Sequence, residues 1–171
     1  MTAAVFVDTN VLVYSRDARD VTKQTLAAQW LQTLWRDQNG RTSMQVLNEY
    51  YSTVTRKLTP RLAPEDAWED VQSLFAWEPQ ATDAALLRLA RDIERRYRIS
   101  WWDALIVGAA QLQQCSLLLT EDLQDGTTFG TVTVKNPFRL KISEPLAAYD
   151  VTVATVSRHP RRGRPPRASR L

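Results

Sequence analysis

Short apolar runs alternate with amphipathic helical segments, and this alternation constrains the fold of the chain more than any other feature. The clearest runs are Ala4–Val7, Ser116–Leu119 and Thr131–Val134. Short strands that are apolar at consecutive positions are buried on both faces, as in parallel sheets. We therefore predict an α/β fold in which a short-stranded, mainly parallel central sheet is covered by helices on both faces.

The segments between these runs carry apolar residues at helical spacing. Helix boundaries are marked by Gly40 as a stop, Ser43 as a cap, Pro64 as a first residue and the Ser100-x-x-Asp103 capping pattern. We expect helices over residues 21–38, 43–58, 64–75, 82–97 and 100–114. Weaker extended segments are expected at residues 41–42, 78–80 and 151–153.

The composition excludes several kinds of chemistry. A single histidine, His159, and a single cysteine, Cys115, cannot form a histidine pair, a Cys/His zinc site or an intrachain disulfide. The five glycines form no phosphate-binding loop motif. No apolar run approaches the ~20 residues of a membrane span, and the N-terminus lacks the features of a secretory signal. We therefore expect a cytoplasmic protein with no membrane partner, rich in carboxylates.

The positive charge is concentrated at the C-terminus. Residues 158–171 contain six arginines and no acid; removing these six from the 22 Lys and Arg residues leaves 16 against 19 acids in residues 1–157. The segment has too few apolar residues to form a core, so we predict that it is disordered. It is either an arm that binds nucleic acid or a solvated extension without a role of its own.

Two acids lie where a catalytic site of an α/β protein is expected, and a third lies on an apolar helix. Asp8 follows the first apolar run and Asp122 follows Leu119, so both lie at carboxyl ends of strands, where open sheets bind ligands. Asp103 lies on the apolar line of its helix, where an ionised carboxylate is costly unless it is paired, capped or metal-bound. Asp103 could equally satisfy the first-turn amides of its own helix. Glu49 lies away from its helix's apolar line and, by periodicity alone, is a solvated residue.

Five motifs in this order resemble a PIN domain, specifically the VapC-like toxin ribonucleases of type II toxin–antitoxin systems. The motifs are Phe6–Leu12, Asn48-Glu49, Trp102–Ile106, Thr120–Gly126 and Asn136–Phe138. The resemblance implies a three-layer α/β/α fold and a nuclease domain over residues 1–138. Such toxins end soon after the last motif, so residues 139–157 form an extension that the family pattern does not explain, followed by the basic tail at 158–171.

The resemblance also implies an acidic quartet that binds metal. It maps onto Asp8, Glu49, Asp103 and Asp122, with Thr9, Asn10, Thr120, Glu121 and Asp125 as auxiliary residues. Oxygen ligands favour Mg²⁺ or Mn²⁺, which would activate a water for hydrolysis of an RNA phosphodiester without histidine. Glu49 would act as a ligand or as a base that orients the water, and the number of ions remains open.

The implied partners are an RNA substrate, a cognate VapB-like antitoxin and a second copy in a homodimer. One helix carries a line of arginines that would contact RNA phosphates or form a solvated face: Arg88, Arg91, Arg95 and Arg98. Four tryptophans would supply an aromatic surface for the antitoxin or pack in the core: Trp30, Trp35, Trp68 and Trp77. The alternative functions are a non-catalytic RNA- or antitoxin-binding module and a Mg²⁺-dependent phospho-accepting receiver domain.

Overall fold

Five short strands form one sheet in the order β2–β1–β3–β5–β4 in the computed structural model, which describes residues 3–139. All neighbouring strands are parallel except β4 and β5, so the predicted mainly parallel α/β sheet is confirmed. The strands are β1 (Val5–Val7), β2 (Gly40–Arg41), β3 (Leu117–Leu119), β4 (Thr128–Phe129) and β5 (Val132–Lys135).

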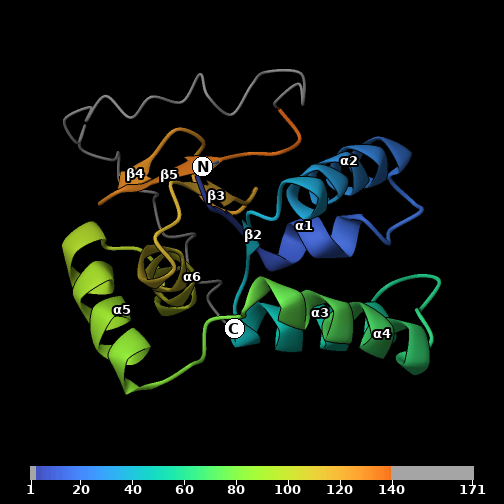
Figure 1. The fold of residues 1–171 in the computed structure, drawn as a ribbon, viewed down its shortest axis with the longest axis horizontal. Coiled ribbons are helices and arrows are strands. Elements are labelled where there is room, and N and C mark those ends of the chain that lie inside the picture. Colours follow the sequence, from blue (N-terminus) through green and yellow to red (C-terminus); the bar gives the residue numbers. More distant parts are fainter. Residues whose placement is uncertain (1–2, 140–171) are drawn as a thin grey trace, which may run out of the picture.

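The helices cover both faces of this sheet. The connection from β1 to β2 and the connection from β2 to β3 run in opposite directions along the sheet, and right-handed crossovers therefore place them on opposite faces. In Figure 1, α1 and α2 accordingly lie on one side of the strands and α5 and α6 on the other. The helices are α1 (Thr9–Tyr14), α2 (Val21–Asp37), α3 (Met44–Arg56), α4 (Pro64–Leu74), the 3₁₀ helix η1 (Phe75–Trp77), α5 (Ala84–Tyr97) and α6 (Trp101–Leu112).

Local capping explains where most of these helices begin. The Ser43 hydroxyl accepts a hydrogen bond from Val46 N at 3.3 Å and starts α3, and Pro64 occupies the first turn of α4. Ser100 accepts from Asp103 N at 3.1 Å and starts α6, as the capping pattern predicts. The helices expected from the sequence are therefore present, with ends that differ by a few residues.

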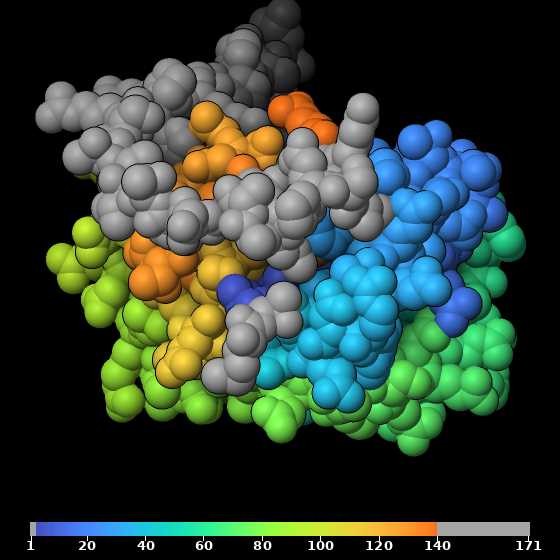
Figure 2. Space-filling model, turned by 45° about the horizontal axis from the view of Figure 1, so that its top comes forward, coloured from blue at the N-terminus to red at the C-terminus, as the bar shows by residue number. Residues whose placement is uncertain are grey.

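The core lies around β1, β3 and α6. The side chains of β1 and β3 are buried, and every residue of α6 from Ala104 to Ala110 is buried as well. An apolar surface around most of α6 therefore packs into the interior, as its composition predicts. Figure 2 shows the light-blue to cyan surface around α2 on the outside of the molecule, with a green surface below it.

Gly40 does not end α2, contrary to the sequence prediction. The helix ends at Asp37, its C-cap Gln38 adopts the left-handed conformation with φ of 53°, and Gly40 instead begins β2. A Cβ atom on Gly40 would lie 2.5 Å from Cε2 of the buried Trp77. Glycine is therefore needed here because the indole of Trp77 packs directly on the backbone.

Other local predictions also need correction. The helix expected over residues 64–75 ends at Leu74, and Phe75 begins η1, where it is 44% exposed. Residues 78–80 form no strand, and Gln80 makes only an isolated bridge with Ser43. Helix α1 and strand β4 were not predicted, since both are very short. The predictions for residues 140–171, including the strand at 151–153 and the disordered tail, lie outside the described residues.

Within residues 3–139, none of the helices has the length and apolar character that crossing a membrane requires.

The contact between Gly40 and Trp77 predicts a specific loss of stability. Gly40→Ala should lower the free energy of unfolding by about 1–3 kcal/mol, because the added methyl group overlaps the indole. Urea denaturation of Gly40→Ala, Trp77→Leu and the double variant measures this effect. The double variant should lose less than the sum of the single losses. Additive losses would show that the two sites do not interact.

Candidate active site

Asp8 lies directly after β1 and anchors the candidate site. Its backbone N–H donates to Leu119 O at 3.1 Å, which ties it to the end of β3. Its Oδ1 accepts from Thr9 N at 2.7 Å, so Asp8 also caps α1. The residue is only 8% exposed. The strand therefore delivers a buried carboxyl group to the carboxyl edge of the sheet.

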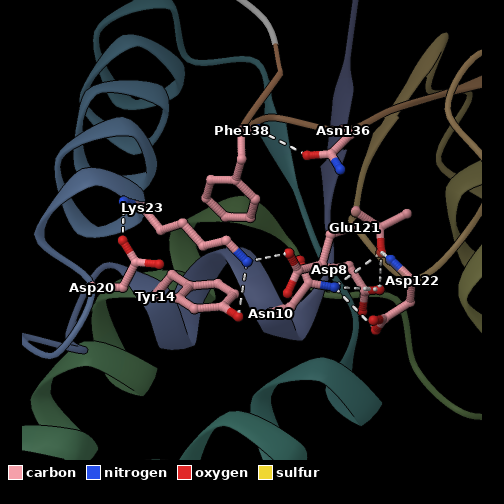
Figure 3. A network of polar contacts seen from close by, with 10 residues as sticks. Asp8, Asn10, Tyr14, Asp20, Lys23, Glu121, Asp122, Asn136 and Phe138 are labelled. Carbon is pink, nitrogen blue, oxygen red and sulfur yellow. Dashed lines mark hydrogen bonds and ion pairs between the residues drawn. The ribbon is translucent and has the colours of Figure 1, made fainter.

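A hydrogen-bonded network joins Asp8 to Asp122 through Thr120 and Asn10 (Figure 3). The buried Thr120 hydroxyl donates to Asp8 Oδ2 at 2.8 Å and accepts from Asp122 N at 3.1 Å. Asn10 Nδ2 donates to Thr120 Oγ1 at 3.0 Å and to Asp122 Oδ2 at 3.1 Å. The ends of β1 and β3 thus bring together both strand-end acids and three of the predicted auxiliary residues, Thr9 included.

Glu49 reaches the same region from α3. Thr9 Oγ1 donates to Glu49 Oε2 at 3.1 Å, and Gln45 Nε2 donates to Glu49 Oε1 at 2.9 Å. The residue is exposed, as periodicity predicts, but its carboxylate is held beside the Asp8 loop. The structure therefore connects Glu49 to Asp8 through Thr9.

Asp103 stands apart from this network. It is half-buried at the first turn of α6, where Ser100 Oγ donates to its Oδ2 at 2.7 Å. Within residues 3–139 it makes no hydrogen bond to Asp8, Glu49 or Asp122. The hydrogen bonds of Asp103 therefore tie it to Ser100, the residue that caps α6, and its carboxylate accepts a hydrogen bond from the Ser100 hydroxyl rather than from a first-turn amide of α6.

Burial and neighbouring carboxylates make ionisation of the Asp8 carboxyl unfavourable. Burial raises the pKa of the Asp8 carboxyl to about 7, and the hydrogen bonds from Thr120 and Thr9 offset only part of this effect. The neighbouring carboxylates of Asp122 and Glu49 raise the pKa of Asp8 further. The site therefore disfavours an ionised Asp8 unless positive charge is supplied.

Two predicted auxiliary acids have other contacts. Glu121 forms an ion pair with Lys23 at 2.6 Å, and Asp125 Oδ1 accepts from Asn136 N at 2.9 Å. Sequence reasoning missed Lys23, because the contact joins α2 to a loop almost a hundred positions away and leaves no local pattern. Asn136 was noted only as part of a motif, and the backbone N–H that donates to Asp125 lies directly after β5.

The oxygen atoms of the site suit a hard cation in their chemistry, but the carboxylates are not arranged around one point. Asp8, Asp122, Glu49, Asn10 and Thr120 offer only oxygen atoms as metal ligands, and Asn10 Oδ1 is buried without a hydrogen-bond partner among the described residues. No group of three or more His, Cys, Asp or Glu side chains in residues 3–139 is placed so that it could hold a metal ion. The residues fit Mg²⁺ or Mn²⁺ by chemistry and charge, and the carboxylates are not gathered into a ligand cage.

The predicted surface residues divide into two groups. The arginines expected along one helix, Arg88, Arg91, Arg95 and Arg98, are all exposed on or just after α5, and Arg91 pairs with Glu94 at 2.5 Å. Trp35 and Trp68 are 40% and 48% exposed. Trp30 and Trp77 are buried, which confirms the core alternative for these two. The buried Trp30 Nε1 donates to Pro137 O at 3.2 Å, so its one polar group is satisfied inside the protein.

A mainly parallel sheet with acids after two adjacent strands defines an α/β protein whose site lies at the carboxyl edge of the sheet. The family model of the PIN domain matches residues 5–124. Because this match covers more than half of the chain, the protein belongs to the PIN domain family. No curated protein matches the chain.

Two solved structures share the fold. A toxin–antitoxin complex from Klebsiella pneumoniae aligns with a TM-score of 0.56 and 18% identity, covering 79% of this chain and 98% of that one. VapC20 of Mycobacterium tuberculosis, a toxin that cleaves the sarcin–ricin loop, aligns with a TM-score of 0.52 and 18% identity, covering 70% and 90%. These likenesses agree with the layered sheet described above.

The raised pKa of Asp8 predicts that stability depends on pH. The folded state holds the Asp8 proton more tightly than the unfolded chain, so the free energy of unfolding should fall as the pH rises from about 4 through about 7. The contribution of Asp8 to this fall is at most roughly 4 kcal/mol. Asp8→Asn should flatten this part of the curve.

Urea denaturation in EDTA between pH 4 and pH 8 measures this dependence. Asp92→Asn, a change at an exposed position in the middle of α5, is the matched control and should keep the wild-type slope. If Asp8→Asn keeps that slope as well, burial of Asp8 does not set the pH dependence.

Proposed function

We propose that this protein is a metal-dependent endoribonuclease that acts as the toxin of a toxin–antitoxin pair. Membership of the PIN domain family supports this proposal. The two structural neighbours are described as a toxin–antitoxin complex and as a toxin that cleaves the sarcin–ricin loop. The observation that carries the proposal is the buried Asp8 carboxyl beside Asp122 and Glu49, a site in which added positive charge would favour the ionised form of Asp8.

Asp8 and Asp122 are the proposed principal metal ligands, together with Asp103. Asn10 and Thr120 orient the first two, because both side chains hydrogen-bond Asp8 or Asp122 at the carboxyl ends of β1 and β3. Glu49 is a ligand or a base that orients water, held in place by Thr9. Asp103 belongs to this set by the resemblance of its motif to the family.

The chain's own residues would prepare the site for a polyanionic substrate. A bound Mg²⁺ or Mn²⁺ would neutralise the acids, lower the pKa of a water molecule and offset the charge that develops on the phosphate. Without that charge, the carboxylates would repel the phosphate backbone of RNA. The described residues offer no histidine, so a carboxylate is the group left to accept a proton from water.

The proposed partners follow from the same assignment. RNA is the substrate, and the exposed arginines of α5 would contact its phosphates. A small VapB-like antitoxin would cover the site, and a second copy of the chain would complete a homodimer. The arginine-rich residues 158–171 are proposed as a further RNA contact. A cytoplasmic location suits an enzyme whose substrate is cellular RNA.

The proposal predicts cleavage of RNA that requires a divalent cation and these acids. Purified protein with Mg²⁺ or Mn²⁺ should cleave structured RNA, and EDTA should abolish the cleavage. Asp8→Asn and Asp122→Asn should each reduce the cleavage rate by about a hundredfold or more, because each removes a ligand charge. A fluorescent RNA cleavage assay with mapped ends measures the rates.

Asp66→Asn, an exposed acid at the first turn of α4, is the control and should cleave at the wild-type rate. Cleavage that persists in EDTA, or in both Asp8→Asn and Asp122→Asn, would contradict the proposal. RNA binding without any cleavage would instead favour a non-catalytic binding module.

A further inference from the structure

Lys23 is enclosed at the edge of the acidic site. Its Nζ donates to Glu121 Oε2 at 2.6 Å and to Tyr14 OH at 3.1 Å. The same ammonium group lies 4.2 Å from the centre of the Tyr14 ring and 5.0 Å from that of Phe138. Figure 3 shows this side chain extending from α2 toward Glu121, between the two rings. Lys23 therefore contacts α1 and two loops that are distant in the sequence.

The position of Lys23 is locally unfavourable for a cation. Asp20 caps α2 by accepting a hydrogen bond from Lys23 N at 3.0 Å, which places Lys23 in the first turn. A positive charge at a helix N-terminus opposes the helix dipole. The ion pair with Glu121 compensates for this cost, and its hydrogen bond also raises the pKa of Lys23. A residue that breaks a local rule in this way points to a tertiary role.

Lys23 joins the two loops that follow β3 and β5. Glu121 belongs to the loop after β3, and Phe138 belongs to the loop after β5. Phe138 packs edge-on against Tyr14 at 5.1 Å, and Trp30 of the same helix donates to Pro137 O at 3.2 Å. Helix α2 therefore holds both loops at the edge of the sheet where Asp8 lies.

The two residues that precede Asp122 are both held in place. The buried Thr120 accepts a hydrogen bond from Asp122 N at 3.1 Å. Glu121 is bound by Lys23, and both side chains of that pair are about three-quarters buried, with 24% and 29% exposed. Because the Glu121 carboxylate is paired with Lys23, it has a structural contact, whereas Asp122 is the acid proposed to bind metal.

We propose that Lys23 is a positioning residue, which fixes Asp122 for metal binding by holding Glu121 and Phe138 against α2. The inference rests on the proposed nuclease function and adds to it a residue outside the acidic quartet. Loss of Lys23 would leave the Asp122 carboxylate available for metal binding, but the loop that carries Asp122 would become more mobile. The effect therefore falls on turnover and on the motion of residues 120–125, and RNA affinity is preserved.

The experiment compares Lys23→Gln, Lys23→Arg and Glu121→Gln in the full chain. Hydrogen exchange of the metal-free protein reports on residues 120–125, and cleavage kinetics with saturating Mg²⁺ report on kcat and KM. Arg36→Gln is the matched control, because Arg36 pairs with Asp37 at 2.8 Å at the other end of α2. Thermal denaturation establishes that each variant is folded.

Lys23→Gln and Glu121→Gln should speed exchange in residues 120–125 and lower kcat about tenfold, with KM changed by less than about twofold. Lys23→Arg should restore both properties, since a guanidinium keeps the ion pair. Arg36→Gln should match the wild type.

Unchanged exchange in residues 120–125 of Glu121→Gln would overturn the proposal, and so would a raised KM with unchanged kcat, which indicates direct contact of Lys23 with RNA. Should Lys23→Gln fail to fold, Glu121→Gln alone decides, because it leaves the aromatic contacts of Lys23 intact. A wild type that cleaves no RNA refutes the nuclease function, whereas the exchange measurement still tests positioning independently.

Discussion

The buried carboxyl group of Asp8 is the constraint on which the rest of the site depends. It follows β1, an interior strand of the sheet, caps α1 and accepts a hydrogen bond from the Thr120 hydroxyl, so it cannot turn toward solvent without disrupting these contacts. The carboxylates of Asp122 and Glu49 make its ionisation still less favourable. The fold therefore makes ionisation of Asp8 unfavourable, and a bound cation would offset this effect. Groups with pKa values shifted in this way are typical of functional sites.

Much of the fold was predictable because its signals are local. The apolar runs that became β1 and β3, the caps at Ser43 and Ser100 and the first-turn Pro64 are each defined by a few adjacent residues. The pairing of Asp8 with Asp122 was predictable too, because parallel strands bring their carboxyl ends to one edge. Glu49 was identified by resemblance to the family, since periodicity alone described a solvated residue.

The remaining features arise from contacts between distant segments, which local patterns do not encode. Gly40 looked like a helix stop, yet it is required by the packing of Trp77. Glu121 looked like an additional ligand, yet Lys23 of α2 pairs with it. The sequence allowed all four tryptophans a place on the surface or in the core, and only the tertiary structure separates the buried Trp30 and Trp77 from the exposed Trp35 and Trp68. Strand β4, two residues long, is too short for a pattern to define.

The central claim is that a divalent cation binds at Asp8 and stabilises the acids around it. Titration of the protein with Mn²⁺, with free Mn²⁺ followed by electron paramagnetic resonance, tests this claim without RNA. The account predicts saturable binding by the wild type and a loss of about tenfold or more in affinity for Asp8→Asn. Equal Mn²⁺ affinity in wild type and Asp8→Asn, or no saturable binding by the wild type, would contradict it.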